Sequence, residues 1–193
     1  MYKYLYLTKE VWADTWINGG EIPISLASTY LHDEREGTLT PDENLIHESP
    51  VDIKSLSPMI SFGKGGGVKG LTMTNCSING GRIPEIIDAN YYTEDGLVLS
   101  LCNSLNEAIA NKLGKECCIR VSNLKHFRKI IDKQLGVKGE MKECTYTDNH
   151  ERNHFLKSTE DAWQDEFRIF WKYQKNEIVK IPKGYAKLVA TYK

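Results

Sequence analysis

The sequence lacks the features that mark membrane, secreted and zinc-binding proteins. No apolar run approaches the roughly 20 residues that span a bilayer, and the first residues lack the apolar core and small-residue cleavage site of a signal peptide. The five cysteines include no CxxC pair, which disfavours both a zinc site and a disulfide framework. We therefore expect a cytoplasmic protein with reduced thiols, no membrane segment and no bound metal.

An excess of charge of one sign is also absent. The chain has 25 Lys and Arg against 26 Asp and Glu, a formal net charge of −1. This balance gives the whole molecule no strong attraction for nucleic acid or anionic lipid. Its 193 residues, 40% of them hydrophobic, suffice for one core and a ligand cleft. We predict a single domain over residues 1–193.

A recognisable nucleotide-binding loop is missing as well. Residues 32–70 form a long polar stretch rich in turn-forming residues, and it ends in the glycine-rich run GKGGGVKG at 63–70. A phosphate-binding loop requires GxxxxGK[ST] between a strand and a helix, whereas no Ser or Thr follows a Gly-Lys pair here. The pattern favours a mobile loop, with a lid over a bound ligand as the alternative.

Strand and helix patterns are both present, without regularly repeating βα units. Residues 2–7 alternate as a strand, with Tyr2, Tyr4 and Tyr6 on one face. A turn is expected at 79–81, and a final hairpin is expected from strands at 177–181 and 185–192. These patterns predict an α+β fold. The other expected elements are helices over 9–18, 104–113, 123–135 and 158–164, and strands over 21–28, 71–78, 97–102, 116–121, 141–147 and 166–171.

The most informative stretch is residues 154–171, HFLKSTEDAWQDEFRIFW. Alternation along the predicted strand at 166–171 places Glu166, Arg168 and Phe170 on one face, and the opposite face is apolar. A carboxylate at a strand start is suited to bind a ribose hydroxyl and to stabilise positive charge on a sugar carbon. The alternative is an exposed Glu–Arg ion pair of small energetic value.

Two sequence patterns carry a resemblance to a known family. Residues 144–171 contain F-x-K, then W-x-x-E-x-R, and the N-terminal region contains K-Y-L-Y, W and G-E-I-P-I-S. Together they resemble a divergent bacterial branch of the ADP-ribosyltransferase superfamily, whose relatives occur in phage-defence and toxin–antitoxin loci. The resemblance implies a split β-sheet with NAD held in the cleft and with Glu166 as the catalytic residue. The resemblance also implies that Arg168, in the same pattern, binds NAD.

The resemblance also implies roles for residues near the N-terminus. Ser28, Thr29 and Tyr30 would orient the ribose or stack on the nicotinamide, and Arg35 would hold the pyrophosphate with two hydrogen bonds. Two departures stand out. Members of the superfamily commonly carry an Arg or His on the first strand, where this chain has Lys3 and tyrosines. A Ser-Thr-Ser sequence is also missing.

The leading hypothesis is a mono-ADP-ribosyltransferase toxin that cleaves NAD and modifies a protein or a nucleic acid. An antitoxin protein is a possible partner by analogy. The alternatives are a non-enzymatic module that binds protein or RNA, and a hydrolase of NAD or another nucleotide. A thiol nucleophile is a further alternative, because Cys144 precedes His150 and His154.

Overall fold

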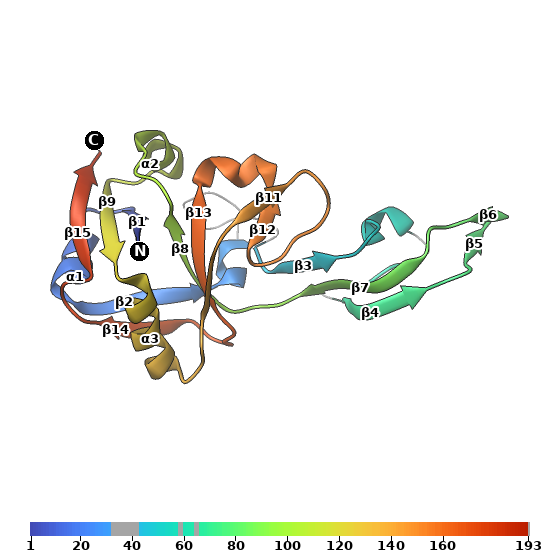
Figure 1. Cartoon of the computed structure of the whole chain (residues 1–193), viewed down its shortest axis with the longest axis horizontal. Helices are drawn as coiled ribbons and strands as arrows, with labels where there is room; N and C mark the ends of the chain where they lie inside the picture. Colours follow the sequence, from blue (N-terminus) through green and yellow to red (C-terminus); the bar gives the residue numbers. More distant parts are fainter. Residues whose placement is uncertain (32–42, 58–59, 64–65, 193) are drawn as a thin grey trace.

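The computed structural model describes residues 1–31, 43–57, 60–63 and 66–192. Figure 1 shows two parts, a head built from both ends of the chain and an arm that projects from it. The arm comprises the described residues between 45 and 93. None of the helices in the described part of the chain is both long and apolar enough to cross a bilayer.

The head contains one large sheet, whose described strands pair antiparallel. Its strand order is β10-β13-β8-β1-β9-β15, and β2 and β14 join at β8. The mixture of this sheet with a few helices agrees with the predicted α+β class. Its strands are β1 (Tyr2–Leu7), β2 (Gly20–Leu26), β8 (Leu97–Cys102), β9 (Cys117–Ser122), β10 (Glu140–Glu143), β13 (Glu166–Trp171), β14 (Glu177–Ile181) and β15 (Ala186–Thr191).

The sheet of the head divides at β8. One end of β8 pairs with β2, through Ser25↔Val98 and Leu26↔Leu97. Its other end pairs with β1 at the single position Tyr4↔Cys102. Strands β1 and β2 therefore share the same edge of β8 and diverge from one another. This divergence separates β1, β9 and β15 from the rest of the sheet.

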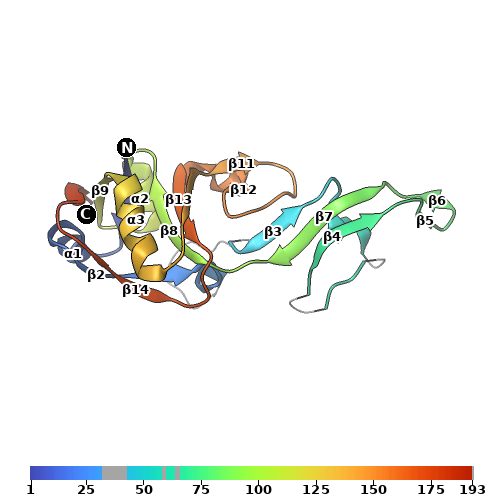
Figure 2. The ribbon, with the colours of Figure 1, turned by 60° about the horizontal axis from the view of Figure 1, so that its bottom comes forward.

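An apolar core lies between the sheet and α3 (Leu124–Leu135), which crosses one face of the head (Figure 2). Phe127 and Ile131 of α3 are fully buried with Ile169 and Trp171 of β13. The indole nitrogen of Trp171 donates a hydrogen bond of 2.7 Å to Asp132 of α3. The side chains of Phe167, Ile169 and Trp171 therefore all face this core, as the alternation in the sequence predicted.

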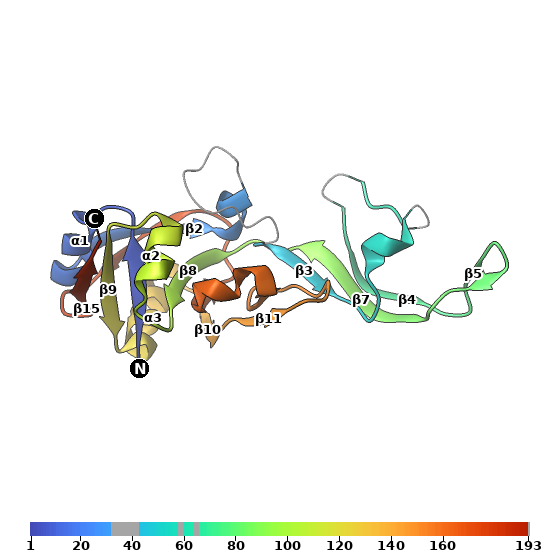
Figure 3. The same ribbon diagram turned by 90° about the horizontal axis from the view of Figure 1, so that it is seen from above.

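The opposite face of the sheet is covered by several short elements rather than by one helix. They are α2 (Glu107–Leu113), the parallel pair β11 (Thr145–Thr147) and β12 (Leu156–Ser158), and the 3-10 helices η1 (Ala27–Leu31) and η3 (Thr159–Gln164). Figure 3 shows α2 beside β1 and β9 and the orange η3 beside β11. The remaining helix, α1 (Trp12–Asn18), precedes β2.

The arm is an antiparallel sheet of β3 (Leu45–Glu48), β7 (Ile86–Thr93) and β4 (Val68–Met73), followed by a small hairpin of β5 (Ser77–Ile78) and β6 (Gly81–Arg82). Its own small core includes Ile53 of the 3-10 helix η2 (Ile53–Leu56) and Ile86. The polar stretch at 32–70 was expected as a loop, yet it contains β3, η2 and the start of β4. The predicted turn after residue 78 is confirmed by the β5–β6 pairing.

Several other predictions from sequence were wrong in detail. Strand β2 ends at Leu26 because the chain turns into η1, where the amide of Ala27 donates to the carbonyl of Gly96. The predicted strand at 141–147 is broken into β10 and β11. The final strands form no hairpin, since β14 pairs with β2 and β15 pairs with β9. Each strand completes an edge elsewhere in the divided sheet, a choice of partner that a local turn does not determine.

Candidate active site

Five charged side chains meet on the covered face of β13. Glu166 and Arg168 come from the strand itself, Lys157 from β12, and Asp161 from η3; Glu43, just before β3, completes the set. We call this set the charge cluster. It holds three carboxylates and two cations, so its formal charge is −1. Glu43, Lys157, Glu166 and Arg168 are all buried, which is rare for charged residues unless they are paired.

Glu166 is held by both cations of the charge cluster. Its Oε1 accepts a hydrogen bond of 2.7 Å from Nε of Arg168. Its Oε2 accepts from Nη2 of Arg168 at 3.1 Å and from Nζ of Lys157 at 3.0 Å. The backbone amide of Glu166 donates to the hydroxyl of Tyr146 at 2.9 Å. With only 4% of its surface exposed, Glu166 is fixed in position and turned into the protein.

The charge cluster keeps Glu166 ionised. Burial alone favours the neutral acid, but the charges of Arg168 and Lys157, together with hydrogen bonds from Arg168 and Ser100, outweigh burial and lower the pKa of Glu166 to about 2. Burial lowers the pKa of Lys157, but the combined attraction of Glu166, Glu43 and Asp161 outweighs it and raises the pKa. Arg168 also donates to the carbonyl of His154 at 3.0 Å, so its guanidinium is held from two sides.

Stability alone does not account for such a cluster. Buried ion pairs lose much of their Coulomb energy to desolvation, and an apolar set of similar volume is often as stable or more so. One oxygen of Glu43, Oε2, is buried without a hydrogen-bond partner among the described residues, and it lies 4.0 Å from Nζ of Lys157. A buried anionic group with spare accepting capacity is a feature of functional sites.

Within the described part of the chain, the structure brings two of the predicted site residues into contact, Glu166 and Arg168. Ser28 and Thr29 lie in η1, near the opposite end of β8. The amide of Ser28 donates to Asp95 Oδ1 at 3.0 Å and its hydroxyl bonds to Asp95 Oδ2, and the hydroxyl of Thr29 donates to Asn176 at 3.3 Å. Asp95 precedes Leu97, whereas Glu166 lies opposite Cys102. The length of β8 therefore separates them by about 17 Å.

The two remaining predicted residues are Tyr30 and Arg35. Tyr30 lies in η1 beside Thr29 and is half-buried. Arg35 lies outside the described residues. Sequence reasoning missed Lys157, Asp161 and Glu43, because nothing in their spacing shows that three separate segments meet over β13.

Two hollows lie near the base of the arm and on the arm itself. The larger, of about 920 Å³, is lined by Glu94, Asp95 and residues 172–175. The smaller, of about 470 Å³, lies on the arm beside Phe62 and Tyr91. Neither is lined by Glu166. Because Glu166 is only 4% exposed, a ligand reaches it only if the layer that covers β13, to which Glu43 and η3 contribute, is displaced.

The thiol alternative is not supported by the surroundings of Cys144. Its side chain is buried, and burial together with the charge of Glu166 raises the pKa of Cys144 to about 12. A thiol with a raised pKa is a poor nucleophile, because the thiolate is the reactive form. The covered face of β13 therefore offers carboxylate chemistry rather than thiol chemistry.

The prediction of no metal site overlooked the HxxxH spacing of His150 and His154. In the structure His150 packs against His47, at 4.7 Å between ring centroids, whereas His154 stacks on Phe170 at 3.7 Å. Among the described residues, no group of three His, Cys, Asp or Glu side chains is placed to hold a metal ion. The two histidines therefore serve different parts of the structure.

The position of Glu166 also relates it to the far strands of the sheet. Cys102 of β8 lies opposite both Glu166 of β13 and Tyr4 of β1. Tyr4 in turn lies opposite Arg120 of β9. Residues directly opposite one another in paired strands project to the same face of a sheet. Glu166, Tyr4 and Arg120 therefore share one face, on either side of the line where the sheet divides.

Comparison of the chain with family models, curated proteins and solved structures finds no match in any of the three. Assignment of a function therefore depends on the charge cluster and on the faces of the sheet.

Proposed function

We propose that the chain cleaves the nicotinamide–ribose bond of NAD and transfers ADP-ribose to a macromolecule, with Glu166 as the catalytic residue. The observation that carries this proposal is a buried carboxylate that two cations fix at the start of an inner strand of the sheet. A negative charge prepositioned in a low-dielectric site stabilises positive charge that develops in a transition state.

Glu166 has two roles in the proposed reaction, to stabilise positive charge and to accept a hydrogen bond. As the glycosidic bond breaks, its electron pair leaves with nicotinamide, and positive charge develops on the ribose carbon and ring oxygen. An ionised carboxylate stabilises that charge and accepts a hydrogen bond from a ribose hydroxyl. A carboxylate has about four acceptor positions, and Arg168 and Lys157 occupy three of those on Glu166. The hydroxyl of Ser100 bonds to Glu166 as well, so a ribose hydroxyl would bind Glu166 in place of Ser100.

Arg168 acts in this proposal as a positioning residue rather than as a ligand of NAD. Its donors are directed to Glu166, to the carbonyl of His154 and to Glu43. Ser28 and Thr29 lie too far from Glu166 to orient the reacting ribose, so they stand outside the catalytic centre. The role of Arg35 stays a prediction. The division of the sheet beside Tyr4 and Cys102 supports the split-sheet resemblance as a part of the same proposal.

The first experiment measures release of nicotinamide from labelled NAD and attachment of the label to macromolecules of a cell extract. We expect Glu166→Gln to lower release by about 100-fold or more, the range found when one prepositioned electrostatic group is removed. Glu166→Asp keeps the charge but withdraws it by one methylene, so an intermediate loss is expected. Release without attachment of the label would favour a hydrolase.

The matched control is Asp132→Asn, which removes a carboxylate on the opposite face of the sheet. Asp132 accepts hydrogen bonds from Trp171 and Gly139 and pairs with Arg128, so its loss also costs stability. We expect this variant to unfold at a lower temperature yet to retain turnover at 20 °C, within about threefold. Equal loss of activity in both variants would assign the effect to folding instead of to catalysis.

If the chain transfers ADP-ribose in cells, it should act there as a toxin. The phage-defence and toxin–antitoxin relatives suggested by the resemblance predict that expression of the chain slows growth, and that Glu166→Gln relieves the effect. An antitoxin protein would be its partner. Equal growth inhibition by the wild-type chain and the Glu166→Gln variant, at matched expression, would separate toxicity from NAD cleavage.

A further inference from the structure

The face of the sheet that holds Glu166 continues, beyond the dividing line, onto β1, β9 and β15. Tyr6 is buried under α2, Tyr4 is half-buried, and Tyr2 is 51% exposed. Exposure therefore rises along β1 as the strand runs out from beneath α2 toward its first residue. We call the open part of this face, formed by Tyr2, Tyr4, Arg120 and Lys187, the tyrosine platform.

The aromatic rings of the platform are arranged by contacts with one another and with a cation. The rings of Tyr2 and Tyr4 pack edge to face, with 5.8 Å between centroids and 83° between planes. The guanidinium carbon of Arg120 lies 5.0 Å from the centroid of Tyr2. A large exposed ring held in place by its neighbours loses little conformational entropy on binding a flat partner. The platform is therefore suited to stacking.

The charge of the platform is positive. Arg120 of β9 lies directly opposite Lys187 of β15, so both side chains project to the same face as Tyr4. The sequences of β1, β9 and β15 contain no acidic residue. The Nε atom of Arg120 is buried and has no hydrogen-bond acceptor among the described residues. A local cationic face thus exists on a chain whose overall charge is near zero.

We propose that the tyrosine platform binds single-stranded nucleic acid, with a base stacked on Tyr2 and the phosphates contacted by Arg120 and Lys187. Stacking aromatics beside cations on adjacent strands are the two features that single-stranded binding needs, and neither requires a particular base sequence. A duplex offers no free base face to Tyr2, and an acidic peptide would use the cations but leave the ring unused.

This binding does not depend on NAD cleavage, but the two proposals are related by position. Tyr4 and Glu166 are two strands apart on one face, a separation of about 10 Å. If both proposals hold, the platform would deliver a nucleic-acid acceptor to the catalytic carboxylate. The test therefore uses no NAD, so that its result stands separately from the result for Glu166.

The experiment measures anisotropy of a labelled single-stranded 10-mer, as RNA and as DNA, titrated with the full chain carrying no N-terminal tag. An untagged start is needed because Met1 adjoins Tyr2. We expect binding that Tyr2→Ala weakens by about fivefold or more and that Tyr2→Phe preserves, since one stacked base is worth a factor of that size. Arg120→Ala should reduce the slope of log affinity against log salt by about 0.7.

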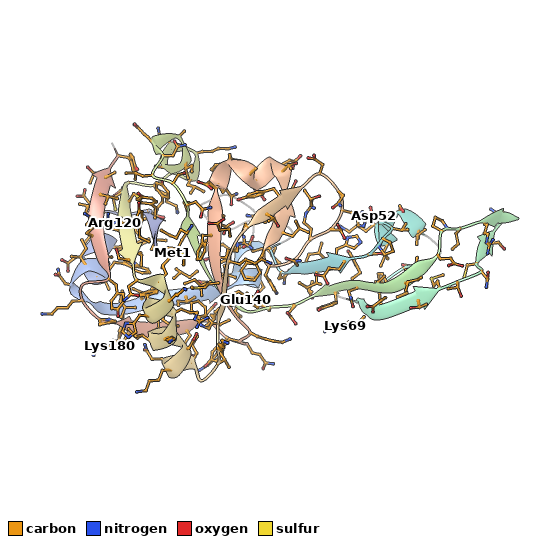
Figure 4. All side chains as sticks on the ribbon, in the orientation of Figure 1. Met1, Asp52, Lys69, Arg120, Glu140 and Lys180 are labelled. Atoms are coloured by element: carbon orange, nitrogen blue, oxygen red, sulfur yellow. The ribbon has the colours of Figure 1, made fainter. Side chains whose placement is uncertain are left out.

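The arm supplies the matched control. Lys69 lies 3.8 Å from the ring centroid of Tyr92, which is a second tyrosine–cation pair (Figure 4 labels Arg120 on the head and Lys69 on the arm). Tyr92→Ala should leave binding unchanged.

The proposal would be overturned by no binding at protein concentrations up to 100 times the probe, by equal binding of wild type and Tyr2→Ala, or by loss of binding in Tyr92→Ala alone. Circular dichroism of Tyr2→Ala, whose side chain is exposed, excludes unfolding as the cause of a loss. Tighter binding of a duplex than of the single strand would also contradict stacking on Tyr2.

Discussion

Replacement of Glu166 by Gln should change how the stability of the protein depends on pH. In the folded protein, the cations of the charge cluster lower the pKa of Glu166 to about 2, against 4.5 for a free glutamic acid. A carboxyl group whose pKa is lowered by folding stabilises the folded state above its unfolded pKa. That contribution is lost as the pH falls from 4.5 through 2.

The size of the effect follows from the shift. Two to three pKa units correspond to about 3 kcal/mol of folding free energy at neutral pH. The same order is expected when one member of a buried ion pair is removed. Near pH 7, Glu166→Gln should therefore be less stable than wild type by about 3 kcal/mol, and the difference between the two proteins should shrink as the pH approaches 2.

The assay is urea unfolding of both proteins between pH 7 and pH 2.5, followed by tryptophan fluorescence. Ile169→Ala is the control, because Ile169 lies on the same strand, faces the apolar core and carries no titratable group. Its stability loss of about 2–5 kcal/mol should stay constant over the pH range. If the loss for Glu166→Gln were equally constant, the lowered pKa, and with it the ionised and paired state of Glu166, would be refuted.

Two further predictions concern packing and cysteine reactivity. A Cβ atom at Gly139 would lie 2.4 Å from Nε1 of Trp171, so Gly139→Ala should lower the free energy of unfolding in urea by about 1–3 kcal/mol. Gly63→Ala is the control and should cost far less, because nothing lies within 4 Å of a Cβ atom there. Equal losses in the two variants would contradict the packing around Trp171. Of the five cysteines only Cys76 is not buried. One thiol of the native protein should therefore react rapidly with a disulfide reagent, and all five thiols should react after denaturation. Fast reaction of Cys144 in the native protein would contradict its burial.

Strand β13 was predictable from sequence because its signal is local. The alternation of Glu166 and Arg168 with Phe167 and Ile169 fixes both faces of β13 within six residues, and the structure has that strand as predicted. The partners of Glu166 and Arg168 from other segments were not predictable. Lys157 reaches Glu166 from a separate short strand, and Glu43, which pairs with Arg168, follows a polar stretch with no periodic pattern. Long-range ion pairing leaves no mark on local spacing.

The arm shows a second reason for failure. Strand β7 reads IIDANYYT, and it contains Asp88 and Asn90, two residue types that are depleted in strands. Asp88 has a φ of 52°, and the register with β4 shifts along the pair, so the strand is irregular where the polar residues occur. A bulged strand places side chains out of the strict period of two that sequence patterns rely on.

The choice of strand partners could not be predicted for a related reason. Residues 177–181 and 186–191 have strand character, and the turn between them is well formed by sequence criteria. Their pairing with β2 and β9 depends on which sheet edges remain open after the rest of the head has folded. Register and partner are decided by tertiary packing, which a single hairpin-like pattern does not encode.

The measurement that bears most directly on the proposed function is release of nicotinamide from NAD by the purified chain and by its Glu166→Gln variant. We expect the wild-type chain to release nicotinamide, and Glu166→Gln to lose about 100-fold or more of that rate while Asp132→Asn retains it. Turnover that persists undiminished in folded Glu166→Gln would contradict the assignment of the buried carboxylate, and absence of release from the wild-type chain would contradict NAD cleavage itself.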